Sequence, residues 1–573
     1  MKFITRPLVM GTNGVVSSGH YLASVIGLRI LEKGGNAVDA GVAMGFALAV
    51  LEPNNYTLGG EAPILIYSAE ERRVYAINGQ GTAPKAATID WFKSRGINII
   101  PGDGFLPATV PAAFDSWITA LSRFGTMSLA EVLAPAIELA ERGFPVYPYL
   151  HESLKMYSRR FLEEWPTTAE VFMPNGEVPK VGELLIQEDL AETLRGAVEA
   201  ERKNLRKGRK KALQAARDYF YKGEVARKIV DFIHKTEVLD ASGMYNKGLL
   251  TLEDFASYKT KIEEPVTTNY RGYQVYKCGP WTQGPVFLQQ LNILEGFDLR
   301  SMGHNSPDYI HTVVEAAKLA FADREKYYGD PDFVHVPLDI LLSKEYAAER
   351  RKLIDPEKAS LELRAGDVHP SSIECMKADF DTTHLDAIDR YGNMISATPS
   401  GGWIQSSPLI EGVGFPLGTR GQMFHLDPKH PEALAPGKRP SATLTPSLVM
   451  KDGKPFMVFG TPGGDRQDQW TLQFFLNYVD FEMNLQEAID APTFHSLHFP
   501  SSFYPHDAHP GVLAVEDRIP EDVREELARR GHKIQVDDGW SHGRVTAVMI
   551  DHEEEVIVGA ASPRYGIAYA VGW

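Results

Sequence analysis

Residues 379–400 read DFDTTHLDAIDRYGNMISATPS, and a hairpin can be recognised in this stretch directly. Apolar and polar side chains alternate over residues 383–389, and the alternation resumes over 394–398. The four residues between them, Arg390-Tyr391-Gly392-Asn393, have the composition of a turn. A period of two residues on both sides of a short turn predicts an antiparallel hairpin. Thr382 places a hydroxyl immediately before the first strand.

Helices and hairpins alternate along the rest of the chain. Further strands are predicted at about 14–18, 63–68, 73–78, 443–450, 455–460, 543–550 and 555–561, and helices at about 20–32, 37–51, 520–530 and from 467 onward. Residues 105–330 are predicted to be mostly helical, with stops at Gly143, Gly223 and Gly272. The helix at 37–51 is apolar on every side, which implies burial between two layers. These elements predict an α+β fold, a four-layer α/β/β/α sandwich.

Composition and charge limit the classes of partner. The chain has 573 residues, of which 43% are hydrophobic, and this is typical of a soluble globular protein. A net charge of −16 argues against general affinity for nucleic acid or an anionic membrane, because both require a positive field. The basic run at 202–211 is short and has no interleaved aromatic residues, which favours a solvated helix face over a nucleic-acid site.

The sequence also suggests a compartment. The N-terminal residues contain no apolar segment of signal-peptide length, and no stretch approaches the roughly 20 apolar residues that a membrane span needs. A cytoplasmic protein without a membrane partner is therefore expected. Cys278 and Cys375 are the two cysteines of the chain, and such isolated thiols suit a reducing compartment, although one disulfide between them is an open alternative.

A second chemically suggestive stretch is GTPGGD at residues 460–465. Two adjacent glycines between a predicted strand and a predicted helix allow two backbone N–H groups to point the same way, and the helix N-terminus adds a positive dipole end. This arrangement suits an oxyanion hole. A phosphate cradle is less favoured because the Gly-Lys-Ser/Thr ending is missing, and a plain tight turn is the structural alternative.

Histidines near the C-terminus raise the question of a metal site: His495, His498, His506 and His509. The pair His506 and His509 lies in a proline-flanked loop, and no third ligand follows at matching spacing. Neither a metal nor another cofactor is expected.

Eight short motifs occur in one order along the chain: KGGNAVDA at 33–40, LGG at 58–60, YRGY at 270–273, ADR at 322–324, GDP at 329–331, TTH at 382–384, DRYGN at 389–393 and TPGG at 461–464. In this ordered set the sequence resembles the gamma-glutamyltranspeptidase family, from about residue 14 to the C-terminus. Each motif alone is weak, but the set is highly specific.

The resemblance implies a mechanism. The precursor is expected to cut itself between Asp381 and Thr382 into a large subunit (1–381) and a small subunit (382–573) that stay associated, with a homodimer of such pairs left open. Thr382 then carries a free α-amino group, whose ordinary pKa of roughly 7.7–8.0 lets it serve as the base for its own hydroxyl. The resemblance gives the oxyanion hole to Gly463 and Gly464.

Supporting roles also follow from the resemblance. Ser400 occupies the position of a hydroxyl that bonds to the nucleophile, and it fits better than Thr398. Thr383 is expected to help orient the new N-terminus.

The residues expected to recognise the substrate depart from the family pattern. Gln80 stands where the family has an arginine, His425 stands where it has an aspartate, and Ala442 with Thr443 replace a pair of serines. The expected substrate is therefore a small amide whose acyl group is not gamma-glutamyl. Candidates to contact it are Gln80, His425, Arg439, Thr443, Arg466, Arg420 and Trp403, with Arg466 preferred for gripping an acidic acyl group.

Two alternatives remain open from the sequence. One is a gamma-glutamyl hydrolase or transferase that recognises glutathione-type substrates through other residues. The other is a non-catalytic relative that keeps the fold for binding, against which the intact Thr382, Thr383, Gly463 and Gly464 argue.

Overall fold

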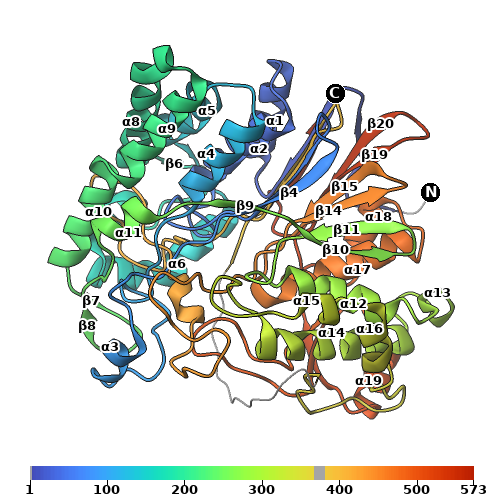
Figure 1. The fold of residues 1–573 in the computed structure, drawn as a ribbon. Helices are drawn as coiled ribbons and strands as arrows, with labels where there is room; N and C mark the ends of the chain where they lie inside the picture. The colour runs from blue at the N-terminus through green and yellow to red at the C-terminus, as the bar shows by residue number, and fades with distance from the viewer. Residues whose placement is uncertain (1–2, 367–380) are drawn as a thin grey trace.

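The computed structural model describes residues 3–366 and 381–573, in which two seven-stranded sheets are stacked face to face between helical layers (Figure 1). The first sheet has the order β21 (Tyr569–Gly572), β2 (Gly14–Ser18), β12 (Leu385–Asp389), β13 (Met394–Ala397), β3 (Ile64–Ser68), β4 (Arg73–Asn78) and β9 (Lys261–Glu263). The second has the order β1 (Val9–Gly11), β20 (Val556–Ala561), β19 (Thr546–Asp551), β15 (Lys454–Gly460), β14 (Ser447–Lys451), β11 (Tyr273–Lys277) and β10 (Val266–Tyr270). Neighbouring strands in both sheets are antiparallel.

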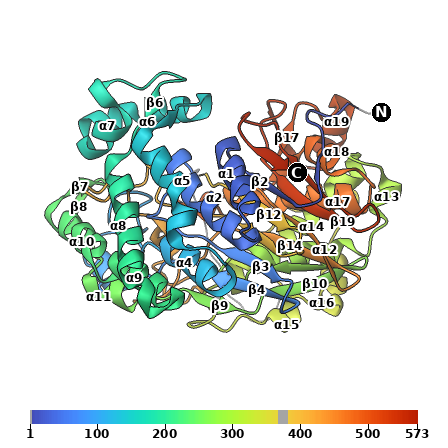
Figure 2. The ribbon, with the colours of Figure 1, turned by 90° about the horizontal axis from the view of Figure 1, so that it is seen from above.

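Helices cover the outer face of each sheet, and Figure 2 shows this order from above. On the side of the first sheet lie α1 (Tyr21–Glu32), α2 (Ala37–Leu51), α3 (Ile89–Lys93), α4 (Ala113–Phe124), α5 (Leu129–Arg142), α6 (Pro148–Glu163), α7 (Pro166–Phe172), α8 (Glu188–Asn204), α9 (Arg209–Tyr221), α10 (Glu224–Lys235) and α11 (Leu252–Ser257). On the side of the second lie α12 (Gly284–Leu294), α13 (Leu299–Met302), α14 (Pro307–Tyr327), α15 (Leu338–Leu341), α16 (Lys344–Arg351), α17 (Gln467–Val479), α18 (Leu485–Asp490) and α19 (Glu521–Arg529). Smaller sheets are formed by β5 (Phe144–Pro145) with β6 (Leu184–Leu185), β7 (Val238–Leu239) with β8 (Tyr245–Asn246), and β16 (Phe494–Ser496) with β17 (Val512–Glu516) and β18 (Lys533–Asp537).

Successive side chains along a strand point to opposite faces of its sheet, so the strands of the first sheet place side chains in two different layers. Val15 and Ile388 pack in the apolar layer between the two sheets, whereas their neighbours Val16 and Ala387 pack against the helices. Both faces of the first sheet are therefore buried. The α/β/β/α prediction is confirmed.

Two of the sequence motifs meet at the start of α2. Asn36 and Asp39 form a capping box, in which the Asn36 side chain accepts from the Asp39 backbone N–H and the Asp39 carboxylate accepts from the Asn36 backbone N–H. Asp389, at the end of β12, accepts a hydrogen bond from the Ala37 N–H at 2.9 Å. The hairpin that begins after Thr382 is thus tied to the buried helix behind it.

Some local predictions need correction. Gly272 was expected to end a helix, but it lies in the turn between β10 and β11, where its φ of 89° suits a residue without a side chain. Gly143 does follow a helix, as the C-cap of α5, and Gly223 lies between α9 and α10. Cys278 is buried, and Cys375, with the disulfide alternative that involves it, lies outside the described residues.

The basic run at 202–211 spans the end of α8 and the start of α9. Arg202 and Lys203 form ion pairs with Glu199 on the same helix. Arg209 donates to the carbonyls of Leu121 and Met127. The run therefore contributes to helix packing at this end of the molecule. Among the described residues, the longest apolar helices are too short or too polar to cross a bilayer.

Three buried histidines give the fold a predicted pH dependence. Burial lowers the pKa of His20 to about 3, of His498 to about 4 and of His532 to about 2, with nearby Lys318 adding to the effect at the last two. In the unfolded chain these groups bind protons near pH 6.5, so their contribution to stability is present above that value and is lost as the pH falls toward 4. Each is expected to lower the free energy of unfolding by up to about 1.4 kcal/mol per pH unit.

Urea unfolding at pH 7, 6 and 5 measures this effect. His20→Asn removes one titrating ring but keeps an acceptor for the Leu22 N–H, which His20 now caps at 3.2 Å. We expect this variant to lose less stability on acidification than the parent, whereas the exposed His335→Asn changes nothing. If the free energy of unfolding falls equally with pH in the parent and in His20→Asn, then His20 does not contribute to the pH dependence of stability.

Candidate active site

Thr382 is buried just ahead of β12. It forms an isolated antiparallel bridge with Ser400, which follows β13. The Thr382 Oγ1 and Ser400 Oγ atoms are 3.2 Å apart. The hairpin thus brings together two hydroxyls that are eighteen residues apart in the chain.

The carbonyl that precedes Thr382 is held by two donors. The Trp403 Nε1–H donates to the Asp381 carbonyl oxygen at 2.6 Å, and the Ser400 hydroxyl lies 3.2 Å from the same oxygen. Both donors are fully buried. Negative charge that develops on this oxygen is therefore met by two fixed donors.

A buried ion pair fixes the orientation of Ser400. Arg420 donates through Nη2 to Ser400 Oγ at 2.9 Å, and its Nε is paired with the Glu61 carboxylate. Burial raises the pKa of Glu61, and Arg420 opposes this shift. Because Ser400 Oγ accepts from Arg420, its own hydrogen is directed to the Asp381 carbonyl or to Thr382 Oγ1. Arg420 thus supports Ser400 and packs over the Trp403 ring, 5.0 Å from its centroid.

Polar partners also hold the residues after Thr382. The Thr383 hydroxyl donates to Glu52, whose pKa is raised by burial. His384 lies between Thr398 Oγ1 and Asp386 Oδ1, at 2.9 Å from each. The start of β12 is therefore fixed by hydrogen bonds on both sides. Thr398 bonds to His384, whereas Ser400 contacts Thr382.

Gly463 and Gly464 lie between β15 and α17, and both have backbone angles that favour glycine, with φ of 130° and 56°. A side chain at Gly463 would collide with the Trp470 ring. The Thr461 hydroxyl, two residues earlier, accepts from the Arg544 backbone N–H at 2.8 Å. This contact connects the glycine turn to the loop before β19.

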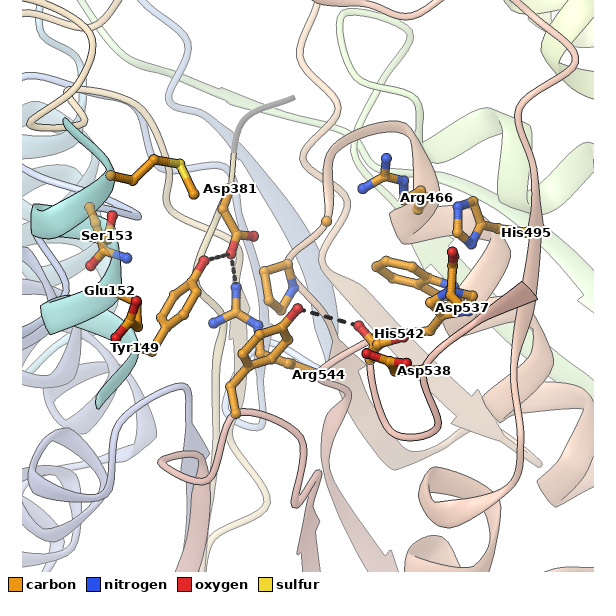
Figure 3. A pocket seen from close by; sticks show the side chains of 18 of the residues that line it. Tyr149, Glu152, Ser153, Asp381, Arg466, His495, Asp537, Asp538, His542 and Arg544 are labelled. Atoms are coloured by element: carbon orange, nitrogen blue, oxygen red, sulfur yellow. Dashed lines mark hydrogen bonds and ion pairs between the residues drawn. The ribbon is translucent and has the colours of Figure 1, made fainter. Parts of the chain in front are cut away.

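A cavity of about 640 Å³ lies between these elements (Figure 3). Its lining includes Asp381 and Gly463, so it opens beside the bond between Asp381 and Thr382. Arg466, the preferred candidate for an acidic acyl group, also lines it. Opposite Asp381 the wall carries an aromatic and histidine cluster made by Trp470, His495 and His542.

The Asp381 side chain has partners that sequence reasoning missed. Tyr149, on α6, donates to Asp381 Oδ2 at 2.6 Å, and Arg544 forms an ion pair with the same oxygen. Burial lowers the pKa of Arg544, but the acidic groups around it together outweigh this effect and raise the pKa above its ordinary value, with Asp381 contributing most and Tyr149, Glu52 and Tyr565 adding to it. Neither residue belongs to a recognisable motif, since both come from elements far from Thr382 in the chain.

The other predicted substrate contacts lie elsewhere. Among the described residues, the cavity lining excludes Gln80, His425, Arg439, Thr443 and Trp403. Gln80 donates to the Pro440 carbonyl at 3.0 Å, and the Arg439 side chain donates to the Lys259 carbonyl. The Thr443 hydroxyl is buried and has no hydrogen-bond partner within residues 3–366 and 381–573, and His425 stacks on His430 with ring centroids 3.7 Å apart. The substrate-binding roles expected for these five residues outside the cavity lining stay predictions.

One group of metal-type ligands occurs in the described part of the chain: His311, Glu315 and His532. Glu315 is ion-paired with Lys318 and Arg364, and the two histidines hydrogen-bond to each other at 2.9 Å. These contacts form a buried polar network between α14 and His532, which lies between α19 and β18.

Two stacked antiparallel sheets between helical layers, with a threonine ahead of a central strand, form the fold of N-terminal-nucleophile hydrolases, and the protein is an enzyme of this hydrolase or transpeptidase class. The chain belongs to the gamma-glutamyltranspeptidase family, whose model matches residues 23–571.

Individual relatives include both hydrolases and acylases. The chain is 36% identical over 510 residues to a glutathione hydrolase proenzyme of Pseudomonas sp. strain A14, with 86% of this chain and 82% of the relative aligned. It is 36% identical over 543 residues to an acylase ACY 1 proenzyme of Pseudomonas sp. strain SE83, which covers 91% and 88% of the two chains. The crystal structure of cephalosporin acylase from Bacillus halodurans matches with a TM-score of 0.85 and 34% identity, over 100% of this chain and 98% of that one.

Proposed function

We propose that the protein is an autoprocessed amidohydrolase that cuts itself between Asp381 and Thr382 and then cleaves a small acyl amide through an ester on Thr382. The observation that carries this proposal is a buried threonine hydroxyl next to a carbonyl that two buried side chains contact through hydrogen bonds. Thr382 Oγ1 lies 3.2 Å from Ser400 Oγ, and the Asp381 carbonyl just before it contacts both Ser400 and Trp403. The names of relatives as proenzymes support self-cleavage.

Self-cleavage proceeds by transfer of an acyl group from nitrogen to oxygen. Thr382 Oγ1 attacks the Asp381 carbonyl carbon, and the oxygen that becomes negative is held by Trp403 Nε1–H and the Ser400 hydroxyl. The C–N bond then breaks, the hydroxyl proton passes to the Thr382 nitrogen, and water hydrolyses the resulting ester. The products are the chains 1–381 and 382–573.

Substrate turnover repeats this chemistry on an external amide. The new α-amino group of Thr382 takes the proton of the Thr382 hydroxyl, directly or through water. The oxyanion is held by the N–H groups of Gly463 and Gly464, whose turn borders the cavity beside Thr382. The amine leaves, and water or another amine releases the acyl group.

The acyl group we propose is not gamma-glutamyl. A gamma-glutamyl group carries an α-ammonium, and the aspartate that the family uses to bind it is replaced here by His425. Burial lowers the pKa of His425 to about 2, so this ring is neutral near pH 7 and offers no negative charge to an ammonium. An ammonium buried without a partner costs several kcal/mol.

A gamma-glutamyl hydrolase or transferase is the second candidate. It is favoured by the identity of 36% to a glutathione hydrolase proenzyme. Such an enzyme would have to bind the α-ammonium through residues other than those of the family pattern.

Hydrolysis of a matched pair of 4-nitroanilides separates the two candidates. Gamma-glutamyl and glutaryl anilides differ only in the α-ammonium, and we expect kcat/KM for the gamma-glutamyl compound to be at least about tenfold lower, since 1.4 kcal/mol of lost binding corresponds to that factor. The assay uses protein whose cleavage has been verified by electrophoresis, with Thr382→Ala as the blank. Efficient turnover of the gamma-glutamyl compound alone would favour the gamma-glutamyl hydrolase or transferase over the proposed function.

A further inference from the structure

The glycine turn between β15 and α17 has its carbonyl groups held by hydrogen bonds. The Pro462 carbonyl oxygen accepts from the Thr461 hydroxyl at 3.0 Å, and the Gly463 carbonyl oxygen accepts from the Arg466 backbone N–H at 3.0 Å. In a planar trans peptide the N–H points opposite to the carbonyl of the preceding residue. The partners of these two carbonyls therefore set the directions of the Gly463 and Gly464 N–H groups.

A side chain at the start of α12 contacts the next carbonyl of the turn. Gln283, the residue before α12, donates through Nε2 to the Gly464 carbonyl oxygen at 3.3 Å. The same oxygen accepts from the backbone N–H of Gln467, where α17 begins. Gln283 is buried, and its own backbone N–H donates to the Ala442 carbonyl at 3.0 Å. The turn is thus attached to a neighbouring helix through a fixed amide side chain.

Arg324 on α14 holds this amide. Its Nη1 donates to Gln283 Oε1 at 3.0 Å and is ion-paired with the carboxylate of Asp465, the residue directly after the glycine pair. Its Nε and Nη2 donate to the Glu325 carboxylate at 2.9 Å and 2.6 Å, and the side chain is only 8% exposed. Because Gln283 Oε1 accepts from Arg324, the amide NH₂ group is the one directed to Gly464.

The Asp465 carboxylate connects the same arginine to a further loop. It accepts from the Ser502 backbone N–H at 2.9 Å and from the Ser502 hydroxyl at 2.6 Å, while Arg324 Nη2 donates to the Pro500 carbonyl at 3.0 Å. Helices α12, α14 and α17 lie together on the outer face of the second sheet (Figure 1). Arg324 therefore joins the glycine turn to two helices and a loop that are separate in the chain.

The proposed self-cleavage and the proposed substrate turnover use different oxyanion donors. The self-cleavage oxyanion is held by Trp403 and Ser400, and Arg420 donates to Ser400 Oγ at 2.9 Å. The turnover oxyanion is held by the glycine turn, to which the Arg324 contacts lead. Each oxyanion site thus has a buried arginine of its own.

We propose that Arg324 and Gln283 are positioning residues for the oxyanion hole of substrate turnover, and not for that of self-cleavage. This proposal rests on the proposed amidohydrolase function and names the residues that prepare its second stage. Both act on the backbone of the turn, through the Gly464 carbonyl and the Asp465 carboxylate. Because an oxyanion hole binds charge that develops only in the transition state, its distortion lowers kcat and leaves KM little changed.

The first test variant is Gln283→Met, which keeps the length of the side chain and removes both hydrogen bonds of the amide. We expect it to cut itself at the parental rate. For the 4-nitroanilide that the parent hydrolyses faster, we expect kcat of the processed variant to fall by about 10–100-fold, since small misplacements in an active site cost up to about 10²-fold. Rates of self-cleavage come from electrophoresis, and kcat and KM come from anilide hydrolysis by fully processed protein.

The second variant is Arg324→Lys, which keeps the charge beside Asp465 but loses the planar fork that reaches Gln283 as well. It is expected to show the same division, with normal self-cleavage and reduced kcat. If Arg324→Lys is insoluble, the result for Gln283→Met decides.

Arg350→Lys is the matched control. Arg350 is a buried arginine that is ion-paired with Asp323, the neighbour of Arg324 on α14, and its loss is expected to leave both rates unchanged. Unchanged kcat in the Gln283 and Arg324 variants would overturn the proposal, and so would equal slowing of self-cleavage and turnover, which indicates a general structural defect. A parent protein that hydrolyses neither anilide would contradict the proposed function, and this inference with it.

Discussion

Purified Thr382→Ala protein is expected to remain a single chain of 63.6 kDa and to lose amide hydrolysis by more than about 10⁴-fold. The substitution removes the hydroxyl that faces Ser400 Oγ and leaves only a methyl group beside the Asp381 carbonyl. Without the hydroxyl no ester forms, and without the cut no free α-amino group is released to act as base. Denaturing electrophoresis and anilide hydrolysis measure the two losses separately.

Thr382→Ser is the matched control, because it keeps the hydroxyl and removes only the methyl group. We expect it to be cleaved and to retain activity within about a hundredfold of the parent, since the nucleophile and the base are both preserved. Cleavage of Thr382→Ala at the same bond would show that another residue performs the cut.

Trp403→Phe is expected to slow self-cleavage by about 10²–10³-fold, the usual cost of losing one oxyanion donor. The phenyl ring keeps the packing against Phe503 and the contact with the Arg420 guanidinium but cannot donate to the Asp381 carbonyl. The rate is read from the fraction of intact chain at intervals after rapid purification.

Trp281→Phe controls for the general effect of losing a buried indole donor. Trp281 donates to Glu263 at 3.0 Å in the layer between the sheets, away from Thr382. We expect this variant to be cleaved at the parental rate. If Trp403→Phe is cleaved as fast as Trp281→Phe, then Trp403 does not stabilise the oxyanion.

Local patterns predicted the elements around the site well. The alternation at 383–389 and 394–398 marks the hairpin of β12 and β13, and the apolar run at 37–51 coincides with the buried helix α2. Period and composition are properties of neighbouring residues, so they can be recognised without knowing the fold. Gly272 shows where this fails, because a glycine between strands and a glycine after a helix look alike in sequence.

The partners of the site could not be predicted in the same way. Tyr149 lies on α6 and Arg544 precedes β19, and only the stacking of the two sheets brings both to Asp381. Glu61 and Arg420 are likewise 359 residues apart in the chain. The sequence suggests Arg420 as a substrate contact. In the structure its guanidinium forms an ion pair with Glu61 and donates to Ser400 Oγ, since a buried charge without a partner is costly.

Intact-mass spectrometry of the wild-type protein, with N-terminal sequencing of its fragments, tests self-cleavage at Thr382 most directly. We expect two chains whose masses correspond to residues 1–381 and 382–573, with the smaller one beginning at Thr382 and its amount rising as the intact chain disappears. A chain that stays intact through prolonged incubation, or a cut at any other bond, would contradict self-cleavage at Thr382.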